Sequence, residues 1–189
     1  MLRPLFFLLS LTLGAGGCSR TQPDADKRLV LTGSSTIAPL ASELARQFEA
    51  TNPGVRVDVQ TGGSSRGVSD ARKGLSDIGM VSRALKTHEK DLTEHTIARD
   101  GITLIAHRHN PVEGLTAEQV RAIFRGEITD WKAVGGKAGP ITVINKADGR
   151  STLELFLKHF GLKGSAIKAS VVIGDNEQGI QTVAGNPGA

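Results

Sequence analysis

Three short turns rich in Gly, Ser and Thr carry the residue types that can bind an anion. They lie at residues 33–36, 62–67 and 148–152, each after an apolar stretch and before a helical pattern. The first N–H groups of a helix have no partner within the helix, and the helix dipole adds partial positive charge there. Gly lets the backbone approach a ligand, and Ser and Thr add hydroxyl donors. Three such termini, if they converge, predict a site for a tetrahedral oxyanion that needs no metal.

Two cationic side chains stand beside the third turn. Lys146 and Arg150 would supply countercharge, and the Arg guanidinium offers two parallel donors to one anion. The alternative for any single turn is structural, because Ser and Thr cap helices and Gly forms turns. The spacing alone does not decide whether the three turns converge.

The second turn also admits an enzymatic interpretation. Residues 63–67 read Gly-Ser-Ser-Arg-Gly, which satisfies the G-x-S-x-G pattern of a nucleophile elbow. Ser65 would then attack an ester, and the base would be one of the five histidines, at positions 88, 95, 107, 109 and 159. No HGGG-type oxyanion motif accompanies this pattern, which argues against a hydrolase. A serine hydrolase is therefore the alternative, and anion binding the preferred interpretation.

Composition argues against several other classes of function. The chain has 189 residues and a formal net charge of +4, with one Trp, no Tyr and no block of basic residues, which disfavours nucleic-acid binding. A single Cys and the absence of H-E-x-x-H argue against a metal site, and no Walker A loop is present. We therefore expect no metal, no cofactor and no catalytic residue.

Strand-like and helical segments alternate along the chain, which predicts an α/β fold with a largely parallel or mixed sheet. The helix that begins near Pro39 repeats Leu40, Leu44 and Phe48, and the helix from residue 116 to 124 opens with a Thr116/Gln119 capping box. Strands are expected at residues 29–31, 55–59, 77–81, 102–106, 141–144 and 171–173. Further helices are expected between Gly67 and Lys73 and at 153–160 and 178–183.

The first 18 residues are typical of an export signal. Arg3 precedes an apolar run that is too short to cross a bilayer, and small residues lead into Cys18. This order resembles a bacterial lipobox and predicts lipidation of Cys18; an ordinary signal peptide is the alternative. The polar residues 19–28 are interpreted as a tether.

Several further motifs, in this order, resemble the substrate-binding proteins of bacterial phosphate ABC transporters. The resemblance runs from about Leu29 to the end of the chain. Beyond the Gly/Ser turns it rests on Asp77-Ile78-Gly79, Ser82-Arg83, Gly101-Ile102-Thr103, Asn110-Pro111-Val112, Gly114-Leu115-Thr116, residues 123–131 (IFRGEITDW) and Val134-Gly135-Gly136.

The resemblance implies a two-lobe periplasmic-binding-protein fold of type II that closes on inorganic phosphate. Lobe one would span residues 29–107 and lobe two residues 108–189. The protein would be a periplasmic or cell-surface lipoprotein that delivers phosphate to a permease in the inner membrane. The implied phosphate contacts are Ser35, Thr36, Ser64 and Ser82 in lobe one and Lys146, Arg150, Ser151 and Thr152 in lobe two.

Three of these positions depart from the family pattern. Lys146 stands where Arg is frequent, and residues 149–152 read Gly-Arg-Ser-Thr instead of Gly-Ser-Gly-Thr. Some members have an Asp at the position of Ser82, which accepts the proton of hydrogen phosphate. A hydroxyl both donates and accepts, so Ser82 is a weaker filter, and sulfate or molybdate stays an alternative ligand. We expect Asp148 to orient Lys146 or Arg150.

Family members continue beyond the equivalent of Ala189 with a strand and a return crossover into lobe one. The resemblance therefore implies a C-terminally truncated form, with sheet edge and apolar surface uncovered in lobe one. A non-functional fragment is a further alternative.

Overall fold

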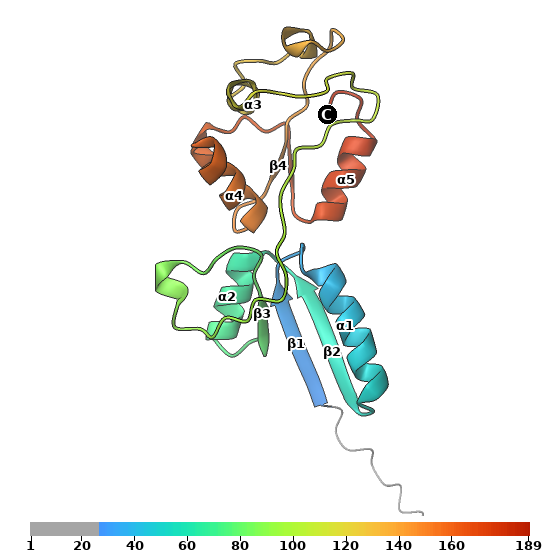
Figure 1. Ribbon diagram of the computed structural model, residues 1–189, viewed down its shortest axis with the longest axis vertical. Helices are drawn as coiled ribbons and strands as arrows, with labels where there is room; N and C mark the ends of the chain where they lie inside the picture. The colour runs from blue at the N-terminus through green and yellow to red at the C-terminus, as the bar shows by residue number, and fades with distance from the viewer. Residues whose placement is uncertain (1–26) are drawn as a thin grey trace, which may run out of the picture.

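The computed structural model describes residues 27–189. Figure 1 shows two lobes, one above the other, each built from a small sheet and its helices. The predicted signal segment, Cys18 and most of the tether lie outside the described residues. Lys27 and Arg28, expected in the tether, belong to the first strand instead. No helix in the described part of the chain has the length and apolar character to span a bilayer.

Lobe one contains a three-stranded parallel sheet in the order β2-β1-β3. Its strands are β1 (Lys27–Gly33), β2 (Val55–Thr61) and β3 (Ile78–Met80), and its helices are α1 (Ala38–Thr51), α2 (Ser64–Arg72) and the 3-10 turn η1 (Thr87–Glu89). The register pairs Leu31 with Val59 on one side and with Ile78 on the other. Parallel strands end at the same sheet edge, so the turns after β1, β2 and β3 gather there.

The core of lobe one uses small side chains where the sequence favoured large ones. Ala38 and Ala41 of α1 are buried with Met80, whereas Leu40, Leu44 and Phe48 are 44–50% exposed. The helix prediction is confirmed, but that apolar row does not form its buried face. The alanines let α1 lie close to a small sheet, and none of residues 27–189 buries the row on the other side.

Lobe two pairs β4 (Ile144–Lys146) with β5 (Val171–Ile173) in parallel, and an antiparallel bridge joins Asp130 to Pro140. Its helices are α3 (Ala117–Phe124), α4 (Ser151–Phe160) and α5 (Asn176–Ala184), with 3-10 turns η2 (Trp131–Val134) and η3 (Gly164–Ala166). The predicted capping box is confirmed, since Thr116 accepts from the Gln119 N–H and Gln119 from the Thr116 N–H. The tilted rings of Phe124, Phe156 and Phe160 pack one against the next, and Phe156 is buried in the core.

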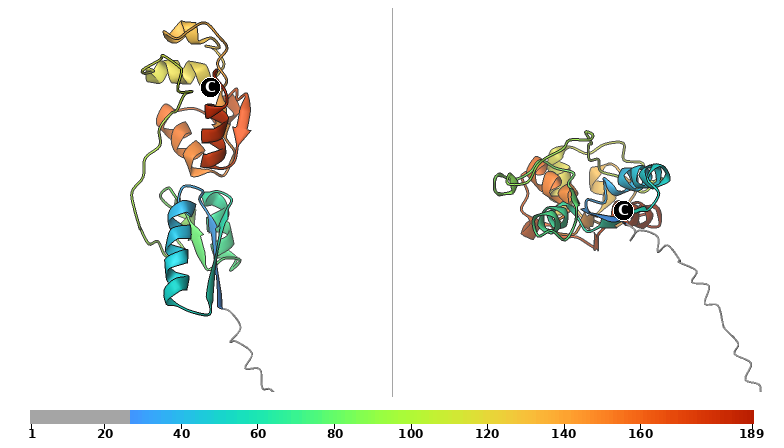
Figure 2. Two further views of the ribbon diagram at one scale, coloured as in Figure 1. Left: turned by 90° about the vertical axis from the view of Figure 1, so that its right-hand side faces the viewer. Right: turned by 90° about the horizontal axis from the view of Figure 1, so that it is seen from below.

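The segment between the lobes corrects one strand prediction. Residues 102–106 were expected to form a strand, but they run as extended chain along the junction, as Figure 2 shows. Residues 93–106 make no backbone–backbone hydrogen bond with any other described residue, and the next bond joins the His107 N–H to the Ala189 carbonyl. An apolar stretch becomes a strand only when another strand lies beside it, and none of the described strands does.

The packing of α2 against the sheet depends on Gly67. A Cβ at this position would lie 2.7 Å from the Met80 carbonyl oxygen and 2.8 Å from that of Thr32. Both atoms belong to the backbone of the sheet, so neither can move away cheaply. The absence of a side chain therefore sets how closely α2 approaches β1 and β3.

We predict that Gly67→Ala destabilises the protein by about 1–2 kcal/mol. Ala gains about 1 kcal/mol in helix propensity, but the forced contact costs more than that. Urea unfolding measures the difference. Gly179→Ala in α5, where the nearest atom is the end of the Ile173 side chain, is the control and should lose less stability. Greater stability of Gly67→Ala would contradict this account of the packing.

A buried ion pair fixes the loop after β3. Arg83 donates to both oxygens of Glu89, at 2.7 and 3.0 Å, and the Lys86 N–H donates to Glu89 at 2.8 Å. Both side chains are almost fully buried. The Arg83 hydrogen bonds, with the Lys86 N–H and the two positive charges, lower the pKa of Glu89 from 4.5 to about 2.

This pKa predicts an acid-sensitive contribution to stability. A carboxyl with a depressed pKa in the folded state stabilises the fold above its unfolded pKa and loses that effect as the pH falls. Wild type should therefore lose, between pH 4.5 and 2, of the order of 3 kcal/mol more than Glu89→Gln. Urea unfolding across this range tests it, with Glu94→Gln, exposed on the same segment, as control. Parallel pH profiles for wild type and Glu89→Gln would contradict it.

Candidate functional site

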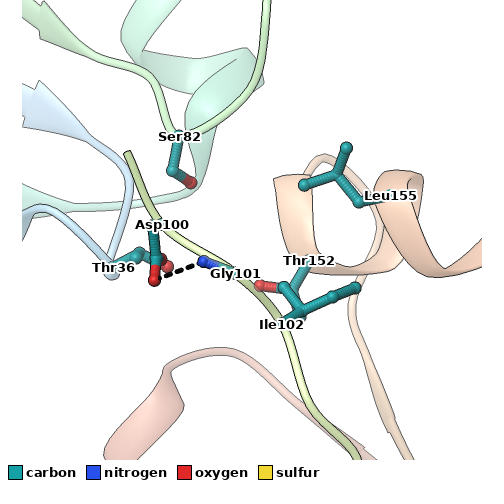
Figure 3. Close-up of a pocket in the computed structure, with 7 residues that line it drawn as sticks. All are labelled: Thr36, Ser82, Asp100, Gly101, Ile102, Thr152 and Leu155. Atoms are coloured by element: carbon teal, nitrogen blue, oxygen red, sulfur yellow. Dashed lines mark hydrogen bonds between the residues drawn. The ribbon is translucent and has the colours of Figure 1, made fainter. Parts of the chain in front are cut away.

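The candidate site lies where the two lobes meet. Its pocket is lined by Thr36 and Ser82 from lobe one, by Thr152 and Leu155 from α4, and by Asp100, Gly101 and Ile102 from the connecting segment. Figure 3 shows the hydroxyls of Thr36, Ser82 and Thr152 around this pocket, with the connecting segment running between the lobes. Three of the eight predicted phosphate contacts are thus on its wall.

A chain of serine hydroxyls lies beside the pocket and joins the lobes. Ser34 donates to Ser82 at 2.8 Å, the Ser82 N–H donates to the Ser64 hydroxyl at 3.1 Å, and the Ser64 and Ser151 hydroxyls bond to each other. Ser64 is completely buried, and Ser34 and Ser151 are nearly so. Ser64, Ser82 and Ser151 were predicted contacts, whereas Ser34 was not.

The local backbone explains why these hydroxyls meet. Ser64 is the first residue of α2 and Ser151 the first residue of α4, so both stand beside N–H groups without helical partners. Gly63 precedes α2 at φ 91°, and a Cβ there would lie 2.7 Å from the Gly149 carbonyl oxygen. The Ser65 N–H donates to that same oxygen at 3.3 Å. The lobes therefore meet backbone to backbone at the second and third predicted turns.

The first turn reaches lobe two through its threonine. The Thr36 hydroxyl accepts from the Asn176 side chain at 3.2 Å, and the Thr36 N–H donates to Ser34 at 3.2 Å. Ser35, the neighbouring predicted contact, is partly buried but does not line the pocket. The three turns do lie together, although each contributes a different kind of contact.

The two predicted cations do not line the pocket wall. Lys146 donates to the Gly174 carbonyl at 3.1 Å, and Arg150 donates to Asp175 at 2.8 Å. Burial, together with the charge of Arg150, lowers the pKa of Lys146, and Asp175 partly offsets this. The expectation that Asp148 orients a cation is wrong, because Asp175 at the start of α5 holds Arg150. Asp175 lies two residues after β5 and immediately before α5, where an aspartate usually serves as a helix cap, so its sequence position gives no specific signal.

Asp100 is the pocket residue that sequence reasoning missed. It is exposed in the connecting segment, and its carboxylate accepts from the Gly101 N–H at 2.7 Å. The Asp-Gly pair is an ordinary turn signal and gives no indication of a ligand contact. The pocket therefore combines hydroxyl donors with one carboxylate acceptor.

The geometry does not assemble the nucleophile that a serine hydrolase requires. Ser65 donates its hydroxyl to Glu154 at 3.3 Å, and none of the histidines described forms a hydrogen bond with it. No group of three or more His, Cys, Asp or Glu side chains in residues 27–189 is placed to hold a metal ion.

Several known proteins resemble this chain. In Bacillus subtilis (strain 168), the phosphate-binding protein PstS is 28% identical over 201 residues, which cover 100% of this chain and 67% of that protein. A putative phosphate ABC transporter substrate-binding protein from Clostridium perfringens, solved with bound phosphate, superimposes with a TM-score of 0.81 at 36% identity. That match covers 86% of this chain and 68% of the other.

A third similar protein is an ABC-type phosphate transport receptor from Vibrio cholerae, with a TM-score of 0.64 at 32% identity over 85% of this chain and 68% of that one. The chain thus spans about two thirds of the length of these relatives. A family model described as a PBP superfamily domain matches residues 19–189. The predicted two-lobe α/β fold of type II is confirmed, and the chain belongs to the PBP superfamily, a family of binding proteins and not of enzymes.

Proposed function

We propose that this protein binds inorganic phosphate between its two lobes and delivers it to an ABC transporter. One observation carries the proposal: hydroxyls from both lobes and the N-terminus of α4 lie around one small pocket. An anion there would receive hydrogen bonds from Thr36, Ser82 and Thr152, all uncharged donors that need no metal. The relatives named for phosphate binding support this ligand.

The two partly buried cations would contribute through space. Arg150 immediately precedes the first residue of α4. Burial and the charge of Arg150 lower the pKa of Lys146 at the end of β4, so both charges lie near the positive end of the helix dipole. Ser64 and Ser151, which now bond to each other, would exchange that bond for bonds to the anion, since each hydroxyl can rotate to donate. We assign all eight predicted residues to the site, three of them at the pocket wall.

We further propose that the lobes divide at residues 107 and 108 and that the protein acts outside the cytoplasm, held at the membrane through a lipid on Cys18. The sequence order of Arg3, an apolar run and small residues before Cys18 supports this placement. The partner would then be the inner-membrane permease of the transporter.

Asp100 supports phosphate over sulfate or molybdate. A carboxylate can accept a hydrogen bond from the proton that hydrogen phosphate carries. A fully deprotonated sulfate has no hydrogen to donate, and the negative charge of the carboxylate repels it. Ser82, which stands where some relatives have an acidic residue, cannot provide this discrimination alone. The connecting segment would thus supply the acceptor from a different place in the chain.

Titration calorimetry of the full chain with inorganic phosphate tests the function. We expect saturable binding and a thermal midpoint that rises with phosphate concentration, because the ligand binds only the folded state. Thr152→Val should weaken binding roughly 10- to 100-fold, the effect of one lost hydrogen bond to an ion. Thr182→Val removes a hydroxyl that bonds only within α5 and should bind like wild type. No heat and no midpoint shift in wild type would refute phosphate binding.

Asp100→Asn tests the choice between anions. The amide can donate to sulfate and no longer repels it, so the ratio of phosphate to sulfate affinity should fall by about tenfold or more. Competition calorimetry at pH 7.5 gives this ratio for both proteins. An unchanged ratio would remove Asp100 from the specificity of the site.

A further inference from the structure

Glu154 joins the lobes by charge. It lies in the first turn of α4, between the pocket residues Thr152 and Leu155, and its side chain reaches into lobe one. One carboxylate oxygen lies 3.0 Å from Arg83 Nε and 3.1 Å from Lys86 Nζ. The other accepts from the Ser65 hydroxyl at 3.3 Å.

The contacts of Glu154 with Arg83 and Lys86 are ion pairs, unlike the other contacts between the lobes. Thr61 with Asp175 (3.3 Å), Asn176 with Thr36 (3.2 Å) and Ser65 with Gly149 (3.3 Å) are single hydrogen bonds that each involve at least one uncharged group. Among the ion pairs of residues 27–189, only those of Glu154 connect one lobe to the other.

Contacts within lobe one position one of the two cations, Arg83. Arg83 is 4% exposed and is fixed by its two hydrogen bonds to Glu89. Its Nε lies within ion-pair distance of Glu154 but is not aligned for a hydrogen bond. The contact is therefore one of charge, and it requires little reordering of the Arg83 side chain.

The charges balance only when the lobes are together. Arg83 and Lys86 bring two positive charges to this corner of lobe one, and Glu89 neutralises one of them. His88 Nε2 also faces Glu89, at 4.0 Å. Separation of the lobes would remove Glu154 and leave the partly buried cluster with an excess positive charge, which is unfavourable away from water.

We propose that Glu154 is a positioning residue, an ionic latch that stabilises the closed arrangement of the lobes both with and without a bound anion. Its effect on binding rests on the proposed function, whereas its effect on closure does not. Because the apparent affinity scales with the fraction of molecules in the competent state, the latch sets how tightly every anion binds without choosing among anions.

The test compares Glu154→Gln with wild type in the full chain. Gln keeps the acceptor for Ser65 and removes the charge. Spin labels at Lys73→Cys in lobe one and Lys163→Cys in lobe two, with Cys18→Ser in every variant, report the distance between lobes by pulsed dipolar spectroscopy. Without ligand, we expect Glu154→Gln to show a larger share of long distances than wild type.

Glu118→Gln is the matched control. Glu118 is also an acidic residue in the first turn of a lobe-two helix, but it pairs with Arg121 of the same helix. The same loss of charge and of helix-dipole contact should leave the distances as in wild type. Lys86→Met should open the lobes less than Glu154→Gln, and the double variant should open them less than the sum of both.

Phosphate titration supplies the second measurement. Glu154→Gln should bind phosphate and sulfate more weakly by the same factor, roughly three- to tenfold, so that their ratio is unchanged. Identical distance distributions for wild type, Glu154→Gln and Glu118→Gln would overturn the latch. If wild type binds no phosphate, the proposed function fails, and the distances without ligand still decide on the latch.

Discussion

The contact between Ser64 and Ser151 constrains the rest of the molecule, because it requires two helix N-termini from different lobes to meet at a fully buried point. Two N-termini repel each other through their dipoles unless something between them accepts hydrogen bonds. Hydroxyls suit this place, since each can accept now and donate to an anion later. Side chains any larger would hold the lobes apart, and Gly63 removes even the Cβ at the closest approach.

The parallel sheets follow from the same requirement. Each of β1, β2 and β4 ends immediately before a turn that leads into a helix, and the turn after β3 carries Ser82. Parallel pairing places the strand ends at one edge in each lobe, and the two edges face each other where the lobes meet (Figure 1). Arg83 directly follows Ser82 at this edge, and its buried ion pair with Glu89 makes the edge sensitive to acid.

Much of the fold could be predicted from the sequence because local rules determine it. Thr116 and Gln119 form the expected capping box, and the apolar repeat at Leu153, Phe156 and Phe160 gives α4. The row of Leu40, Leu44 and Phe48 gives α1 as well, but periodicity reports that a face is apolar and not that something covers it. The strand expected at residues 102–106 failed for a related reason, since strand propensity does not supply a neighbour.

The site was harder to predict where it depends on residues that are distant in the sequence and meet only in the folded protein. Serines at helix starts were identifiable, because Gly/Ser turns after strands have few other purposes when three occur together. Asp100 and Asp175 were not, since an aspartate before a helix or in an Asp-Gly pair is usually structural. Asp148 was the nearer carboxylate in sequence, yet Asp175 is the one that the sheet places beside Arg150. The Glu154 contact likewise joins residues about 70 positions apart, beyond any local pattern.

The extended segment at residues 93–106 sets the effective concentration at which one lobe meets the other. Within the described chain it is the one covalent path between the lobes, and no ladder of backbone bonds stiffens it. Closure then resembles the association of two tethered partners, with an effective concentration in the millimolar range set by the length of the tether. Contacts too weak to hold two separate proteins together suffice under that condition, so the interface can stay small, polar and reversible, as the proposed delivery of phosphate would require.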